Sequence, residues 1–228
     1  MKATRGQKRL RFPNQHGGNR KHDWARRMRR RGRRVRVPHR RRAALAARFP
    51  VHVTMRVAVG LPSLRRLSTF WVVRRALVEG ARRGGFRVNH YSVQSNHVHL
   101  ICEATDRDAL SRGMQGLAVR IARRLNRLWR RRGAVWSERY HDRILRSPKE
   151  VRFALGYVLN NSRHHGVFLV GAGPCPYSSG AWSDGWSDYR VGREAARRCP
   201  LPRAWTALQR SLWRRHGLLS TRRTPVGA

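Results

Sequence analysis

The sequence predicts an α+β protein, a split βαβ sandwich in which helices cover one face of an antiparallel sheet. Two patterns in residues 51–166 lead to this fold class: short segments in which apolar and polar residues alternate, and longer ones with apolar residues three and four positions apart. They follow the order strand, helix, strand, strand, helix, strand, helix, which suits this architecture. A basic N-terminal arm, residues 1–50, and an irregular C-terminal extension, residues 167–228, flank the domain.

A strand and a helix are predicted at the start of the domain. Residues 51–59 are rich in β-branched side chains and alternate in polarity until Gly60 and Pro62 interrupt the pattern. Ser63 is then a suitable N-cap, and apolar residues recur at helical spacing from there to Gly84.

A hairpin is predicted next. Residues 86–93 alternate again, a tight turn occupies 94–96, and a further strand runs from His97 to Glu103. Side chains point to opposite faces along a strand, so His97 and His99 must point the same way.

The second half of the domain is predicted to be a helix, a short strand and a final helix. A long amphipathic helix begins at Asp106 or Ser111, and its polar face is lined with arginines. Residues 140–145 form the strand. Ser147, followed by proline and then by glutamate at the third helical position, starts the last helix, which Gly166 ends.

The C-terminal extension has a different composition from the domain. Beyond Gly171 the chain is rich in glycine, serine and tryptophan, which favours irregular structure packed by its tryptophans. A short final helix is predicted from Ala204 to Arg215.

The charge of the chain points to a polyanionic partner. The sequence has 52 Lys and Arg residues against 11 Asp and Glu, a net charge of +41, and nucleic acid is the default partner of such a protein. Residues 1–50 contain a single acidic residue, Asp23, among runs of arginine. The positive charges of these arginines should repel one another, so we expect a mobile arm that becomes ordered mainly on contact with phosphate.

The cellular setting is predicted from what the sequence lacks. The three cysteines show no CxxC spacing, which argues against a disulfide framework and a thiolate zinc site. No apolar run has the length of a membrane span, and the N-terminus has no apolar segment of a signal peptide. We therefore expect a soluble cytoplasmic protein with no membrane partner.

The histidine pair is the main sign of chemistry in the sequence. Two imidazoles on one face of a strand suit a metal ion, which needs at least a third ligand. Tyr157 and Asn161 are four apart on the last helix, so they share one of its faces. The amide oxygen of Asn161 with two imidazoles suits Mg²⁺ or Mn²⁺ better than zinc. The alternatives are hydrogen-bonded structural histidines, a capping role for Asn161 and a half-buried ring at Tyr157.

Three motifs together resemble the single-tyrosine HUH transposases, the small bacterial insertion-sequence transposases and their relatives linked to repetitive extragenic palindromes. The motifs are Asn96-His97-Val98-His99-Leu100, Gly133-Ala134-Val135-Trp136-Ser137-Glu138-Arg139-Tyr140 and Tyr157-Val158-Leu159-Asn160-Asn161. The resemblance implies the HUH fold for residues 51–166. It implies that His97 and His99 bind a divalent metal, that Tyr157 is the nucleophile and that Asn161 completes the metal site. The family often has a proline after this asparagine, and Ser162 stands there instead, so Asn160 is the alternative ligand.

The resemblance also implies an activity. The protein would be a metal-dependent tyrosine transposase that nicks and rejoins single-stranded or hairpin DNA through a covalent 5′-phosphotyrosine. Some relatives are dimers that share tyrosines and others act alone, so a homodimer is possible. No GxxxxGK[ST] loop is present, consistent with a reaction that needs no nucleotide. Arginines predicted to contact DNA phosphates are Arg120, Arg123, Arg124, Arg127, Arg139 and Arg143.

Other readings of the sequence remain open at this point. Tyr140, Tyr91 and Tyr177 are rival nucleophiles, and a metal-dependent nuclease would need no tyrosine. A non-catalytic basic module of the RNA-binding type, or an inactive domesticated transposase, would also be basic. An RNA-binding sheet uses exposed aromatic residues on its central strands, whereas here the third strand offers His97 and His99, which favours the enzyme.

Overall fold

The predicted antiparallel sheet is present. The computed structural model describes residues 42–161 and 173–223. Its sheet has five strands in the order β2-β3-β4-β1-β5, and every neighbouring pair is antiparallel. The strands are β1 (Val51–Arg56), β2 (Arg82–Arg83), β3 (Phe86–Val93), β4 (His97–Ala104) and β5 (His141–Ile144). The hairpin of β3 and β4 was predicted from the alternation, whereas the two-residue β2 was not.

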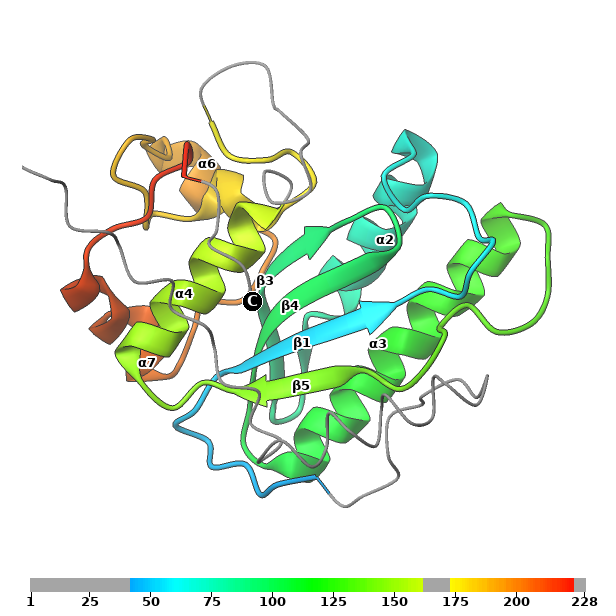
Figure 1. Ribbon diagram of the computed structural model, residues 1–228, viewed down its shortest axis with the longest axis horizontal. Helices are drawn as coiled ribbons and strands as arrows, with labels where there is room; N and C mark the ends of the chain where they lie inside the picture. Colours follow the sequence, from blue (N-terminus) through cyan, green and yellow to red (C-terminus); the bar gives the residue numbers. More distant parts are fainter. Residues whose placement is uncertain (1–41, 162–172, 224–228) are drawn as a thin grey trace, which may run out of the picture.

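Helices cover both faces of the sheet, not one face as predicted (Figure 1). Helices α2 (Leu67–Gly80) and α3 (Arg107–Leu128) lie on one side, where they enclose the larger core. Helix α4 (Pro148–Leu159) lies on the other side, where Ile101 of β4 packs against it. The prediction missed this arrangement because the apolar face of α4 does not indicate which side of the sheet it covers. The α+β class itself is confirmed.

Local signals in the sequence set the starts of α3 and α4, whereas α2 begins at Leu67 with no side-chain cap and not after Ser63 as predicted. The carboxylate of Asp106 accepts a hydrogen bond from the backbone N–H of Ala109 at 2.7 Å and caps α3. Ser147 caps α4 in the same way through the N–H of Glu150, with proline in the first turn. Gly113 lets α3 approach the sheet closely, because a Cβ there would lie 2.2 Å from the ring of Phe86.

The C-terminal extension packs on the same side of the sheet as α4. It contains the short helices η1 (Ser179–Trp182), α6 (Arg193–Arg197), α7 (Ala207–Arg210) and η2 (Leu212–His216). The single helix predicted for 204–215 is thus two short helices broken at Ser211. Trp186 and Trp213 are buried against α4, as expected of tryptophans that pack an irregular segment.

The N-terminal arm lies mostly outside the described residues, which begin at Arg42. From there the end of the predicted arm packs on the domain: Leu45 is buried in the core, and Arg42 forms an ion pair with Asp142 at 2.8 Å. Among the described residues, no helix has both the length and the apolar character needed to cross a membrane.

Candidate active site

The two predicted histidines lie on the central strand of the sheet and face α4. His97 and His99 are nearly buried, at 7% and 4% exposure, and their ring centroids are 4.6 Å apart. They share the face of β4 that carries Ile101, which packs against α4, whereas Val98, Leu100 and Cys102 face the larger core. The alternation of β4 therefore places both imidazoles between the sheet and α4.

Tyr157 reaches this pair from above the sheet. Buried apolar residues of α4, among them Leu155 and Val158, hold the helix down, so its half-buried tyrosine faces the strand. The ring centroid of Tyr157 is 5.1 Å from that of His99, with the rings close to perpendicular at 79°. The structure thus brings the predicted nucleophile together with two of the predicted metal ligands, His97 and His99.

A third histidine, which the sequence analysis missed, belongs to the same group. His52 on β1 has its Nε2 at 3.2 Å from Nδ1 of His99, and its ring centroid is 5.8 Å from that of Tyr157. Thr54 Oγ1 lies 3.0 Å from the same Nδ1. Burial lowers the pKa of His52 to about 4, and the nearby Arg143 acts in the same direction. The polar positions along β1 were visible in the sequence, but their register against β4 was not.

Helix α4 ends at Leu159, so Asn161 lies beyond it and does not share a helix face with Tyr157 as predicted. The two asparagines that follow the helix differ in their surroundings. Asn161 is completely buried, and neither its Oδ1 nor its Nδ2 has a hydrogen-bond partner among the described residues. Asn160 is the C-cap of α4, and its Nδ2 donates to the carbonyl oxygens of Ser220 at 2.8 Å and Arg223 at 3.2 Å. A buried amide without partners is costly unless a ligand satisfies it, so Asn161 fits the role of a ligand better than Asn160.

The donor set defines what kind of ion would fit. In the described part of the chain, no group of three or more His, Cys, Asp or Glu side chains is arranged to hold a metal ion. An ion here would therefore depend on two imidazoles and an amide oxygen. That mixed set, with no thiolate and with positions left for water or phosphate oxygen, suits Mg²⁺ or Mn²⁺.

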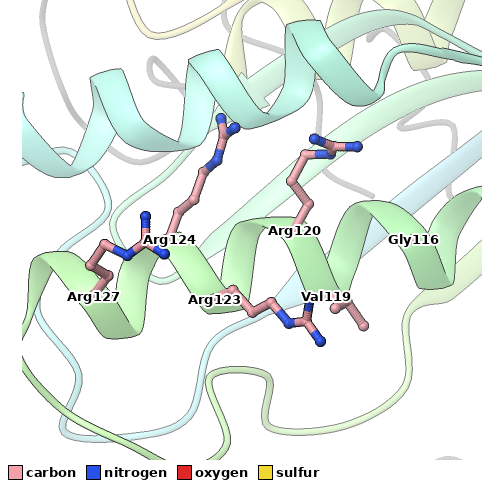
Figure 2. A pocket seen from close by; sticks show the side chains of 6 residues that line it. All are labelled: Gly116, Val119, Arg120, Arg123, Arg124 and Arg127. Atoms are coloured by element: carbon pink, nitrogen blue, oxygen red, sulfur yellow. The ribbon is translucent and has the colours of Figure 1, made fainter.

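The predicted DNA-binding arginines fall into separate regions. Arg143 lies on β5 beside His52, with its guanidinium 3.1 Å from the Glu150 carboxylate, and Arg139 is exposed just before β5. The other four, on α3, lie on the opposite side of the sheet, where with Gly116 and Val119 they line a groove of about 390 Å³ (Figure 2): Arg120, Arg123, Arg124 and Arg127.

The rival tyrosines have other environments. Tyr91 is completely buried in the larger core, and that burial raises its pKa to about 12. Tyr140 has the Arg42 guanidinium 3.7 Å from its ring centre, and Tyr177 packs on Phe70 with ring centroids 4.7 Å apart. Of the four tyrosines considered from the sequence, Tyr157 is the one for which the structure records a ring contact with a predicted metal ligand.

Comparison with known proteins gives a match to a family model and a likeness to solved structures. Residues 66–160 match the family model described as "Transposase IS200 like". A REP-associated tyrosine transposase, solved bound to a REP hairpin, is similar at 16% identity over 75% of this chain and 100% of that chain, with a TM-score of 0.52. At that identity the likeness shows a shared fold.

A second solved structure and the curated proteins add less. A transposase candidate from Deinococcus radiodurans R1 is 16% identical over 48% of this chain and 85% of that chain, with a TM-score of 0.36. No curated protein matches.

Proposed function

We propose, from the premise that residues 66–160 form a domain of the IS200-like transposase family, that this protein nicks and rejoins single-stranded DNA through a covalent bond to Tyr157. The observation that carries the proposal is the contact of the Tyr157 ring with His99, beside His97. A nucleophile next to a pair of metal-binding side chains is the arrangement that phosphoryl transfer needs, because catalysis there consists mainly of positioning and charge stabilisation.

The residues of the chain would divide the chemistry as follows. His97, His99 and Asn161 would hold a Mg²⁺ or Mn²⁺ ion, which when bound neutralises charge on the scissile phosphate. The Tyr157 hydroxyl loses its proton and attacks phosphorus, the bond from phosphorus to the 3′ oxygen breaks, and the departing 3′ oxygen takes up one proton in exchange. The products are a 5′-phosphotyrosine and a free 3′-OH. Attack of a 3′-OH on the phosphotyrosine restores the phosphodiester and releases Tyr157, so no nucleotide cofactor is needed.

The partner would be DNA, in part as a hairpin. The REP-associated transposase of similar fold binds a hairpin, and this chain carries its own basic surfaces on α3 and around Arg139 and Arg143. Tyr157 lies against the histidines of its own chain, so one chain supplies both parts of the site without a homodimer. We place the protein in the bacterial cytoplasm, where its DNA substrate lies.

A covalent-capture experiment tests the proposal. Wild-type protein is incubated with a single-stranded oligonucleotide in the presence of Mn²⁺, and the mixture is separated on a denaturing gel. The oligonucleotide carries its label on the 3′ side of the expected nick, the part that would stay bound to Tyr157. We expect a labelled adduct of the protein. Tyr157→Phe should abolish the adduct, whereas the matched control Tyr140→Phe, which keeps the cation contact with Arg42, should retain it.

Each other outcome assigns a different function. An adduct that persists in Tyr157→Phe would show that another residue is the nucleophile. Cleavage by the wild-type protein without an adduct would indicate a metal-dependent nuclease. Binding of a DNA hairpin without cleavage would indicate an inactive, domesticated transposase, and a preference for RNA over DNA would indicate an RNA-binding module.

A further inference from the structure

A residue of the turn before β4 forms a hydrogen bond with one ring nitrogen of His97. Nδ1 of His97 lies 2.7 Å from the side-chain oxygen Oδ1 of Asn96. An amide oxygen only accepts hydrogen bonds, so with the Asn96 amide in this orientation the imidazole proton is on Nδ1. The backbone of Asn96 is itself fixed, because its carbonyl oxygen accepts a hydrogen bond from the N–H of Val57 at 2.9 Å.

Two residues of strand β1 lie within hydrogen-bond distance of the corresponding ring nitrogen of His99. Thr54 lies directly opposite His99 in the register of β1 and β4, and its Oγ1 is 3.0 Å from His99 Nδ1. His52 Nε2 is 3.2 Å from the same atom. A hydroxyl and the unprotonated nitrogen of a neutral imidazole can both accept a hydrogen bond, so a proton on His99 Nδ1 would have two acceptors within reach.

The two histidines thus have the same nitrogen occupied by neighbours, although the neighbours come from different elements. A histidine that binds a metal usually donates its other ring N–H to a nearby acceptor, which fixes the tautomer and the orientation of the ring. If the proton is on Nδ1, the lone pair is on Nε2. The two rings, with centroids 4.6 Å apart, would then offer one lone pair each.

We propose that these neighbours are positioning residues, which keep both imidazoles in the Nδ1–H tautomer and so present both Nε2 atoms to a divalent ion. Asn96 does this for His97. Thr54 and His52 do it together for His99. This inference rests on the proposed function because that function needs the ion. Asn96, Thr54 and His52 would orient the ligands without binding the ion themselves.

The tautomers can be measured directly in the metal-free protein. Long-range ¹H–¹⁵N correlation spectra of protein labelled with ¹⁵N-histidine distinguish the Nδ1–H from the Nε2–H form of each ring. We expect the Nδ1–H pattern for His97 and His99 in the wild type. Asn96→Ala should give His97 a mixture of tautomers, and Asn96→Asp, which keeps an acceptor, should restore the single form.

Metal affinity provides the second measurement. We expect Asn96→Ala to weaken Mn²⁺ binding, measured by calorimetry, by about 10–100-fold, the usual effect of losing such a neighbour. Asn96→Asp should bind at least as tightly as the wild type. Because His99 has two acceptors, Thr54→Val and His52→Phe should each weaken binding less than the double variant does.

A matched control separates this role from general disturbance of the site. Ser92 lies opposite His99 on the β3 side, and its Oγ accepts a hydrogen bond from the Gln94 side-chain amide at 2.7 Å. Ser92→Ala should change neither the His99 tautomer nor the Mn²⁺ affinity. Thermal unfolding of every variant shows that the comparison is made on folded protein.

The failure of this inference differs from the failure of the proposed function. An Nε2–H pattern in the wild type would overturn the inference, as would unchanged tautomers and Mn²⁺ affinity in Asn96→Ala and in the double variant, even if the DNA adduct still forms. The converse result, correct tautomers and metal binding without any adduct, would leave the inference standing and remove the function.

Discussion

Two partly buried imidazoles on the α4 side of the sheet are held neutral by their surroundings. Burial lowers the pKa of both His52 and His90 from 6.5 to about 4, and for His90 the charge of Asp184 acts in the opposite direction. Between pH 4 and 6.5 an unfolded chain binds a proton at such a histidine, whereas the folded chain does not. Stability must therefore fall as the pH decreases through this window, because protonation favours the unfolded state.

His90 offers a clean test, because it lies outside the proposed metal site. We expect the free energy of unfolding of the wild type to decrease from pH 6.5 to pH 4.5, with His90 contributing at most about 1.4 kcal/mol per pH unit. His90→Gln should decrease less steeply, and His216→Gln, which removes an exposed imidazole, should match the wild type. Urea unfolding at several pH values measures the slopes. Parallel slopes for His90→Gln and wild type would show that His90 is not held neutral.

At the scale of elements, local sequence signals were sufficient to predict individual strands and some helix starts, but not how distant segments pair. The alternation around His97 and His99 predicted a strand and a shared face, and the caps at Asp106 and Ser147 predicted helix starts that the structure confirms. The register of β1 against β4 depends on packing between distant segments, so His52 could not be placed beside His99.

The C-terminal extension is the part of the chain whose structural role the sequence did not predict. It contacts the outer side of α4, where Arg152 donates to the carbonyl oxygens of Gly217 and Leu218, and Trp213 and Leu219 join the core under the helix. A Gly- and Trp-rich composition predicts irregular packing but not its target. The extension thus helps to hold Tyr157 over the sheet.

Glu103 attaches the extension to the sheet on the same face of β4 as His97 and His99. It is completely buried on β4, and its carboxylate accepts hydrogen bonds from the N–H groups of Trp205 at 2.8 Å and Thr206 at 2.9 Å, and from the Thr206 hydroxyl at 2.7 Å. Glu103→Ala would leave these buried donors without an acceptor.

We therefore expect Glu103→Ala to lower the free energy of unfolding by about 2–4 kcal/mol, and chemical denaturation measures it. Glu103→Gln keeps one acceptor oxygen and should lose less. As a control, Glu194→Gln removes an exposed carboxylate paired with Arg198 and should change stability by less than about 0.5 kcal/mol. A loss no larger than that in Glu103→Ala would mean that the extension does not depend on this carboxylate.

At the scale of the whole molecule, the proposed chemistry and the arginines of the α3 groove lie on opposite sides of the sheet (Figure 1). Tyr157 is on α4, whereas the α3 groove is formed on the other side, next to α2. Glu79 of α2 pairs with Arg120 at 3.4 Å and with Arg124. Among the described residues, no acidic partner is recorded for Arg123 or Arg127, so these two guanidinium groups are the ones in the groove that no ion pair occupies.

This separation predicts that binding and chemistry can be changed independently. Arg123→Ala combined with Arg127→Ala should weaken binding of a DNA hairpin and make the slope of log Kd against log salt shallower by roughly one for each phosphate that the variant no longer neutralises. The rate of adduct formation on fully bound DNA should not change, because neither residue is near Tyr157. Titrations at several salt concentrations, with single-turnover rates at saturating DNA, measure both quantities. Arg198→Ala, an exposed arginine outside α3, is the control. An unchanged salt slope would exclude the α3 groove as a phosphate-binding surface, and a slower bound-state rate would show that it acts on the chemistry across the sheet.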